Sequence, residues 1–255
     1  DQVYKDSVAY QDLFGGQAML TLVTMDEGHT VDELFTEENR AKFTDVAEQL
    51  RADGSIETVI TPVDVMDFND ALVSSDSGDV TQSVAGQALL RATTEDLTEE
   101  GPAARQADAV ATLERINAIP PDERNLDNPE FVDFLLRDNE GEIRLALRSF
   151  FPDDTHAQMV THLVGNASID EEGAGADVTQ EAAGQLEFDN ASVVTTGAPV
   201  LLQDINDYLT GGMLTLGAIA ATIMVIILLI FFDVRWRLLP LGVIIVGLVW
   251  AFGAA

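Results

Sequence analysis

The chain has 255 residues, no cysteine and a formal net charge of −31 at pH 7. The lack of cysteine excludes disulfides and thiol catalysis, and the strong negative charge argues against binding to nucleic acid or to anionic headgroups. Because Lys5 and Lys42 are the only lysines, the acidic surface suits a salty medium, so we expect a halophilic source or, alternatively, a high-GC genome and an extracellular domain.

The first elements expected are a short helix and a strand. Residues 1–16 are polar with spaced apolar positions, and Gly15-Gly16 is expected to end the helix. Residues 18–25, AMLTLVTM, are nearly all apolar or β-compatible. So short an apolar run is typical of a buried strand.

A helix and a second strand follow and complete a β-α-β unit over residues 18–65. Residues 30–33 have the form of a capping box, and residues 36–52 place apolar side chains on one helical face. That face consists of Phe43, Val46, Ala47 and Leu50. Residues 56–65 predict the second strand, which Pro62 confines to a sheet edge or ends early.

The middle of the chain predicts a helical insertion over residues 68–137. Residues 80–98 and 102–118 are rich in alanine and favour two helices, separated by the Glu-Glu-Gly-Pro sequence at 99–102. Asn128-Pro129 is a good cap followed by a first-position proline, so it predicts the start of another helix. The apolar stripe of that helix consists of Phe131, Phe134 and Leu135.

A second β-α-β unit is expected over residues 143–196. Residues 143–149 alternate apolar and other side chains with the period of a half-buried strand, and residues 157–164 predict another strand. Residues 168–188 predict a helix that opens with a capping box, and residues 191–196 predict the closing strand. The helix should align Ala174, Val178, Ala182 and Leu186. Two such units around an insertion suggest a split, ferredoxin-like α+β fold.

Two apolar segments at the end of the chain predict a transmembrane helical hairpin over residues 213–255. Residues 213–232 contain no group that is charged at neutral pH and, as a helix, can cross a hydrocarbon core about 30 Å thick. Residues 199–209 predict a helix that leads into this span. A second run, residues 238–255, has Pro240 in its first turn, where proline is tolerated. We expect this second helix to be truncated and the chain to be a piece of a longer membrane protein.

The turn between the two spans predicts their orientation. Arg235 and Arg237 place residues 233–237 on the cytoplasmic side by the positive-inside rule, and Trp236 suits the depth of the headgroups. Residues 1–209 are then extracytoplasmic. We therefore expect a multi-pass protein of the plasma membrane.

Individual motifs in the outer part predict no catalytic, cofactor-binding or metal-binding site. Residues 173–175 (Gly-Ala-Gly) lack the third glycine of a dinucleotide loop and follow two acidic residues, so helix packing explains them better. Residues 153–156 and 76–79 contain side chains of the metal-ligand type, but solvated turns explain both. The sequence therefore predicts no enzyme. Asn166 and Asn190 begin N-glycosylation sequons whose use stays open.

Three segments resemble the resistance-nodulation-division (RND) superfamily of transporters. They are YQDLFGG at 10–16, TTGAPVLLQDINDYLTGGM at 195–213 and FDVRWRLLPLGVIIVGLVWAFG at 232–253. Within this superfamily the chain is most similar to exporters related to the mycobacterial membrane protein large (MMPL) lipid transporters. The resemblance covers essentially the whole chain, but only part of a full transporter.

The resemblance implies an extracytoplasmic porter domain between the first and second transmembrane helices. Residues 1–209 match that domain, residues 213–232 match the second helix, and residues 238–255 match the start of the third. Such proteins use proton antiport for the efflux of hydrophobic or amphiphilic molecules, including lipids and drugs. Their proton-relay carboxylates lie in a fourth helix and its pseudo-repeat, and neither span here contains an ionisable residue.

We therefore expect the chain to supply the porter domain and coupling helices of an exporter. Its expected partners are the lipid bilayer, the amphiphilic substrate and the remaining transmembrane helices. Gly211 and Gly212 are candidate hinge residues at the junction. Two alternatives stay open: an accessory protein of Sec-type protein translocation, and a membrane-anchored binding or sensor domain.

Overall fold

The computed structural model describes residues 2–94, 100–231, 242–243, 246 and 250. The chain divides into two compact units, residues 1–201 and 202–255, and each is described by itself. The first unit contains a sheet and most of the helices. The second contains most of one long apolar helix.

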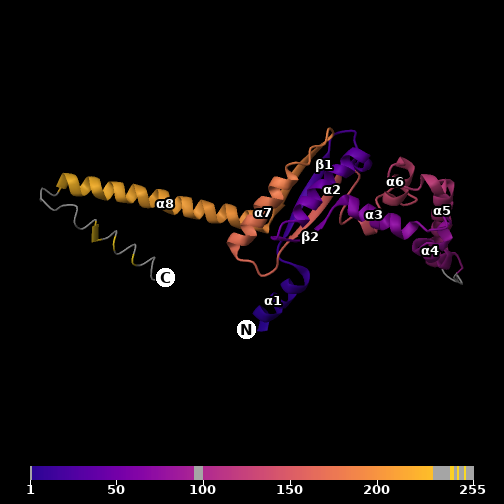
Figure 1. Ribbon diagram of the computed structural model, residues 1–255, viewed down its shortest axis with the longest axis horizontal. Helices are drawn as coiled ribbons and strands as arrows, with labels where there is room; N and C mark the ends of the chain where they lie inside the picture. The colour runs from indigo at the N-terminus through magenta and orange to yellow at the C-terminus, as the bar shows by residue number, and fades with distance from the viewer. Residues whose placement is uncertain (1, 95–99, 232–241, 244–245, 247–249, 251–255) are drawn as a thin grey trace. The chain divides into compact units, whose positions relative to one another are not determined.

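A four-stranded antiparallel sheet lies at the centre of the first unit (Figure 1). Its strands are β1 (Ala18–Met25), β2 (Ile56–Ile60), β3 (His156–Leu163) and β4 (Ala191–Gly197). They lie in the order β2-β3-β1-β4, so β3 separates β1 from β2, and β1 separates β3 from β4. Each β-α-β unit is thus split by a strand of the other, and the predicted α+β class is confirmed.

Helices α2 (Glu37–Arg51) and α7 (Ile169–Ala183) lie against one face of this sheet (Figure 1). The alternation along β1 separates the two faces, because Met19 and Val23 are fully buried whereas Leu20 is 39% exposed. Helix α2 buries the predicted apolar face, which is confirmed as Phe43, Val46, Ala47 and Leu50.

Helix α7 begins as predicted but ends earlier. The Ser168 hydroxyl accepts a hydrogen bond from the N–H of Glu171, and the Glu171 carboxylate accepts one from the N–H of Ser168, which confirms the capping box. The helix ends at Ala183 rather than at Phe188, and Ala174, expected on the buried face, is exposed. The buried face consists of Gly173, Gly175, Ala176, Thr179, Ala182 and Ala183. These small residues let the helix lie close to the sheet.

Helix α1 (Gln2–Phe14) confirms the predicted first helix, and Gly15, with φ +80°, follows it. The capping box predicted at 30–33 is wrong. Residues Val31–Phe35 form the 3-10 helix η1, and the Thr30 hydroxyl donates to the carboxylate of Asp32 instead of capping. A 3-10 turn aligns side chains three residues apart, so it buries Val31 and Leu34 together.

The segments between β2 and β3 form the helical insertion. They are α3 (Pro62–Val73), η2 (Val80–Gln82), α4 (Val84–Thr94), α5 (Glu100–Ala118), η3 (Pro121–Glu123), α6 (Pro129–Leu136) and η4 (Leu145–Leu147). As predicted, Asn128 caps α6 by accepting a hydrogen bond from the N–H of Glu130. Residues 100–102, predicted to separate two helices, instead form the first turn of α5, while residues 95–99 lie outside the described part.

The second predicted strand ends at Ile60 and lies at the sheet edge, as Pro62 indicated. Its predicted continuation to Val65 is wrong, because those residues begin α3. Thr61 and Asp64 form a complete capping box there, with Pro62 in the first helical turn. In this box the Thr61 hydroxyl and the Asp64 carboxylate each accept a hydrogen bond from a backbone N–H group that a helix start otherwise leaves unpaired.

The strand predicted at 143–149 is also wrong. Only Ile143 forms a bridge, to Arg137, and the helix η4 follows. Ile143 and Leu147 are buried but Leu145 is 81% exposed, so the apolar residues do not share one face of a strand.

One apolar core joins the sheet to the insertion. Met19 and Met159 of the sheet are fully buried, as are Met66 of α3 and Phe131 of α6. The insertion is therefore packed into the core of the first unit.

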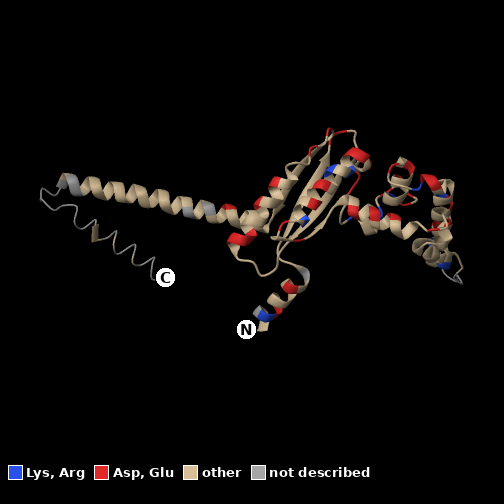
Figure 2. Cartoon of the chain, in the orientation of Figure 1, with Lys and Arg blue, Asp and Glu red and all other residues tan. Residues whose placement is uncertain are grey.

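Helix α8 (Ala198–Phe231) is the long apolar helix. By length and composition it is the one helix of the described residues that could cross a membrane, with a candidate span at Ala198–Ile227. Figure 2 shows Asp and Glu residues, coloured red, distributed over the first unit, whereas the sequence of α8 has no charge beyond Asp207. The predicted turn 233–237 and most of the predicted second span lie outside the described residues.

Candidate functional site

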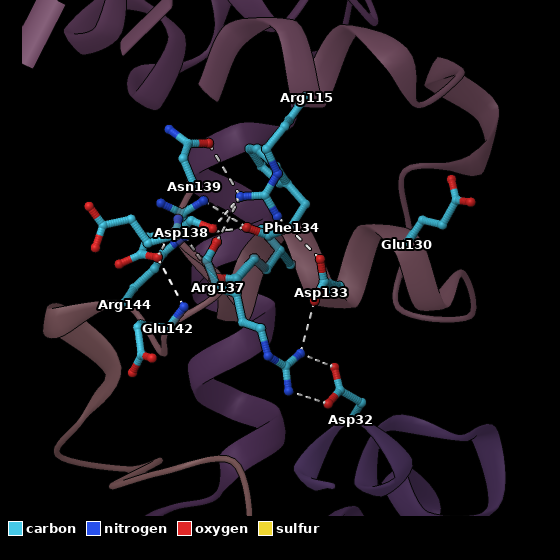
Figure 3. A network of polar contacts seen from close by, with 12 residues as sticks. Asp32, Arg115, Glu130, Asp133, Phe134, Arg137, Asp138, Asn139, Glu142 and Arg144 are labelled. Atoms are coloured by element: carbon cyan, nitrogen blue, oxygen red, sulfur yellow. Dashed lines mark hydrogen bonds and ion pairs between the residues drawn. The ribbon is translucent and has the colours of Figure 1, made fainter. Parts of the chain in front are cut away.

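Arg137, directly after α6, is the centre of a polar network that links the insertion to the sheet (Figure 3). Its guanidinium donates to both oxygens of Asp32 at 2.6 and 2.7 Å, to Asp133 at 2.9 Å and to Asp154 at 2.9 Å. The Arg137 side chain is 13% exposed. Asp32 lies in η1 and Asp154 lies two residues before β3, so one cation connects three parts of the fold.

The charges of this network stabilise one another. Burial alone would raise the pKa of Asp32, but hydrogen bonds from Arg137 and Thr30 outweigh it, so the net pKa is lowered. The same pairing raises the pKa of Arg137. Asp32 and Arg137 are therefore both ionised at neutral pH, and their pairing acts as a structural connection.

Two further guanidinium groups flank Phe134 of α6. The Cζ atom of Arg115 lies 5.5 Å from the ring centroid and that of Arg144 lies 5.3 Å from it. Arg115 also donates to the carboxylate of Asp133 at 3.2 Å. Both distances are within cation–π range.

Arg144 differs from Arg115 in its partners. Its Nη2 and Nε donate to the backbone oxygen of Phe134 at 2.8 and 3.3 Å, and Nε lies 3.2 Å from that of Leu135. Within the described part of the chain, no carboxylate lies within 4.0 Å of it. Burial and the charge of Arg115 lower the pKa of Arg144, although Asp138 and other carboxylates further away act in the opposite direction.

An apolar cavity of about 290 Å³ lies in the insertion, between α3, α4, α5 and α6. Its apolar wall includes Leu72, Val73, Val80, Leu89, Ile116 and Leu135. Asn69, Thr112 and Arg144 supply its polar groups. Asn69 and Thr112 already donate to helix carbonyl groups, at Val65 and Asp108.

A larger hollow of about 940 Å³ lies at the connection between α7 and β4. Lys42, Glu187 and Asp189 contribute charged side chains to its lining, next to Phe188 and Val193. Lys42 already pairs with Glu38. The smaller cavity is the better candidate for an apolar ligand, since its lining is predominantly aliphatic.

The predicted hinge residues Gly211 and Gly212 lie within α8, and a Cβ atom added at either would meet no atom within 4 Å. Arg235, Trp236 and Arg237 lie outside the described residues. The sequence did not predict the Arg137 network or the cavity. Arg144 was expected on a strand, so its contact with α6 was not foreseen.

The motifs weighed as metal or nucleotide sites have structural roles. Asp153 accepts hydrogen bonds from the N–H of Thr155 and from His156, which lower its pKa to about 2 against the opposing effect of burial. Gly173 and Gly175 are buried inside α7 rather than in a loop. Among the described residues, no three His, Asp or Glu side chains are grouped so that they could hold a metal ion.

The described chain consists of an α+β unit followed by a helix that is long and apolar enough to cross a bilayer. The model of the MMPL family matches residues 6–255, so the chain belongs to the MMPL family, whose members are membrane transporters of the RND kind rather than enzymes. This confirms the resemblance seen in the sequence. Searches among curated proteins and among solved structures gave no significant match.

Proposed function

We propose that this chain is the porter domain and coupling-helix segment of an RND-type exporter that uses the proton gradient to move hydrophobic or amphiphilic molecules. The observation that carries the proposal is the family match, which runs over both the α+β unit and α8. It favours an exporter over a Sec accessory protein or an anchored sensor domain. Residues 1–209 are the porter domain, and residues 213–232 and 238–255 are transmembrane.

Several features of α8 suit a lipid environment. The hydroxyl groups of Thr215 and Thr222 donate to the carbonyl oxygens of Gly211 and Ala218 at 2.8 Å, so both are satisfied within the helix. Met213, Leu216 and Ile230 are each about 70% exposed. Lipid and the remaining transmembrane helices of the transporter are the partners that would cover them.

A direct connection between strand and helix supports a coupling role. β4 ends at Gly197 and α8 begins at Ala198, so no linker separates the sheet from the helix. Gly211 and Gly212 are the proposed hinge between the domain and the span. The span has no ionisable group, so the proton-relay carboxylates of the mechanism belong to other helices.

Transport by the full-length protein tests this function. We would reconstitute it in liposomes that contain a fluorescent amphiphile and measure movement with and without an imposed proton gradient. Movement that requires the gradient supports the proposal. Equal rates with and without the gradient would contradict it.

Orientation can be tested separately because the chain has no native cysteine. Ser77→Cys lies at an exposed position of the insertion, and Val234→Cys lies in the predicted cytoplasmic turn. A membrane-impermeant maleimide added to intact cells should label the first variant only. Labelling of the second variant alone would overturn the proposed sidedness.

A further inference from the structure

We propose that the cavity between α3, α4, α5 and α6 binds a single-chain amphiphile with an anionic headgroup, which Arg144 contacts. Binding at this site does not require transport. The role of the bound molecule as cargo does rest on the function proposed above. The proposal names a site inside the insertion that the family assignment does not specify.

The volume and lining of the cavity suit one alkyl chain. Its volume of about 290 Å³ is at the small end of the range for ligand sites. Aliphatic side chains from all four helices and from η2 line it, including Leu72, Val80 and Ile116. Protein cores contain few voids larger than a water molecule, so an aliphatic cavity of this size is suited to an apolar occupant.

The positive charge of Arg144 at the cavity wall favours an anionic headgroup. Arg144 is half-buried and has no carboxylate within 4.0 Å in the described residues, whereas Arg115 and Arg137 each form an ion pair with a carboxylate. Hydrogen bonds from Nε and Nη2 to α6 hold the guanidinium in place. In the described structure its Nη1 donates to no protein group, so this nitrogen has free hydrogen-bonding capacity.

Arg144 is the cation near Phe134 that would interact with an anionic headgroup. Arg115 lies on the same aromatic ring, but its charge is offset by its ion pair with Asp133. A carboxylate or sulfate headgroup would offset the charge of Arg144 with charge-assisted hydrogen bonds. A cationic headgroup would be repelled, and a neutral one would leave the charge of Arg144 without a counterion.

The net charge of the chain makes this preference testable. At −31, the protein repels anions in general and attracts cationic amphiphiles without specificity. Binding of an anionic amphiphile must therefore depend on a local positive site. The matched probes are dodecanoate and dodecanol, which share a chain length and differ in headgroup charge.

Photo-crosslinking of the whole chain, held in amphipol at pH 8, tests the site. The probe is dodecanoate with a diazirine near its methyl end, and crosslinked peptides are mapped by mass spectrometry. We expect crosslinks in α3, α4 or α5, and competition by dodecanoate at least about tenfold better than by dodecanol, as a charge-assisted hydrogen bond implies. Crosslinks confined to α8, or equal competition by both compounds, would overturn the proposal.

Three variants separate the headgroup contact from the cavity. Arg144→Gln should lower the crosslinking yield about tenfold or more. Arg148→Gln is the matched control, because Arg148 is exposed and, within the described residues, donates only to the carbonyl group of Ile143, so its yield should not change. Ala85→Phe fills the cavity but leaves Arg144 unchanged, and this variant should abolish the crosslinks.

Circular dichroism confirms that each variant is folded, and the competition between the two probes needs no variant at all. An unchanged yield in Arg144→Gln would overturn the role of Arg144. If the site binds dodecanoate but the full-length protein shows no gradient-dependent transport, the proposed function fails and this inference stands.

Discussion

Arg137 and Asp32, 105 residues apart in the sequence, form an ion pair in which both terminal nitrogens of the guanidinium donate to the two carboxylate oxygens, at 2.6 and 2.7 Å. Arg137 follows the last α-helix of the insertion, and Asp32 lies in η1, next to the sheet. The pair therefore holds the insertion against the sheet. A bidentate guanidinium–carboxylate pair also fixes orientation, because both groups are planar.

Replacement of Arg137 by methionine should destabilise the first unit by about 2–4 kcal/mol, because it leaves Asp32, Asp133 and Asp154 without their shared cation. Urea unfolding followed by circular dichroism measures the change. Arg148→Met is the control and should change stability by less than about 1 kcal/mol, since Arg148 is exposed. Equal effects of the two variants would show that the network contributes little.

Ionisation of Asp32 and ionisation of Asp67 should have opposite effects on the stability of the fold. The pKa of Asp32 is lowered on folding, so this group contributes stability above its unfolded value of 3.8 and loses it as the pH falls through the folded value. Burial and the nearby charge of Asp64 raise the pKa of Asp67, so ionised Asp67 opposes folding above pH 3.8.

At pH 7, Asp32→Asn should therefore reduce the free energy of unfolding by about 1–3 kcal/mol. Asp67→Asn should increase it by roughly a few tenths of a kcal/mol. Below pH 3.8 the two effects should shrink toward zero as the native carboxylates become protonated. Urea unfolding at pH 7, 5 and 3 measures both. The assignment is contradicted if both variants shift stability in the same direction at pH 7.

Gly86 should be intolerant of any side chain. A Cβ atom there would lie 1.8 Å from the backbone oxygen of Val80, so Gly86→Ala must displace α4 from η2. We expect a loss of roughly 1–3 kcal/mol, as for an overpacked core. Gly101→Ala is the control, because a Cβ atom there meets nothing within 4 Å, and it should leave the urea midpoint unchanged or raise it slightly, since alanine favours a helix over glycine. Tolerance of Gly86→Ala would refute the close contact.

The proposed hinge predicts an effect on transport alone. Gly211→Ala combined with Gly212→Ala should stiffen α8, since alanine favours a helix by about 1 kcal/mol per residue over glycine. In the full-length protein, transport should fall while expression stays constant. Gly217→Ala, in the same helix and also without a neighbour within 4 Å, is the control. Unchanged transport in the double variant would remove the hinge from the proposal.

Local patterns predicted the strands of the sheet well. β1 was predicted at its observed bounds, and β3 and β4 within one residue, because short apolar or alternating runs are bounded there by turn residues. The failure at 143–149 has a tertiary cause. Arg144 bonds to carbonyl groups at the end of α6, and this contact replaces a strand that alternation alone favoured.

A local signal was missed at the start of α3. Thr61 and Asp64 have capping-box spacing with Pro62 between them, and this combination marks a helix start. The polar network had no such signal, because Asp32 and Arg137 meet only in the folded chain. The cavity likewise depends on how the insertion helices pack, which their individual patterns do not specify.

The position of the insertion has a consequence for how such proteins can diversify. Ile60, the last residue of β2, lies opposite Val160 of β3, and β3 begins at His156, so the chain leaves the sheet and returns to it at the same end of the β2–β3 ladder. Antiparallel neighbours need no more than a tight two-residue turn to join them. The ladder thus places no demand on the length of the excursion between them, and a lobe of another size can occupy this position if it preserves the core that the insertion shares with the sheet.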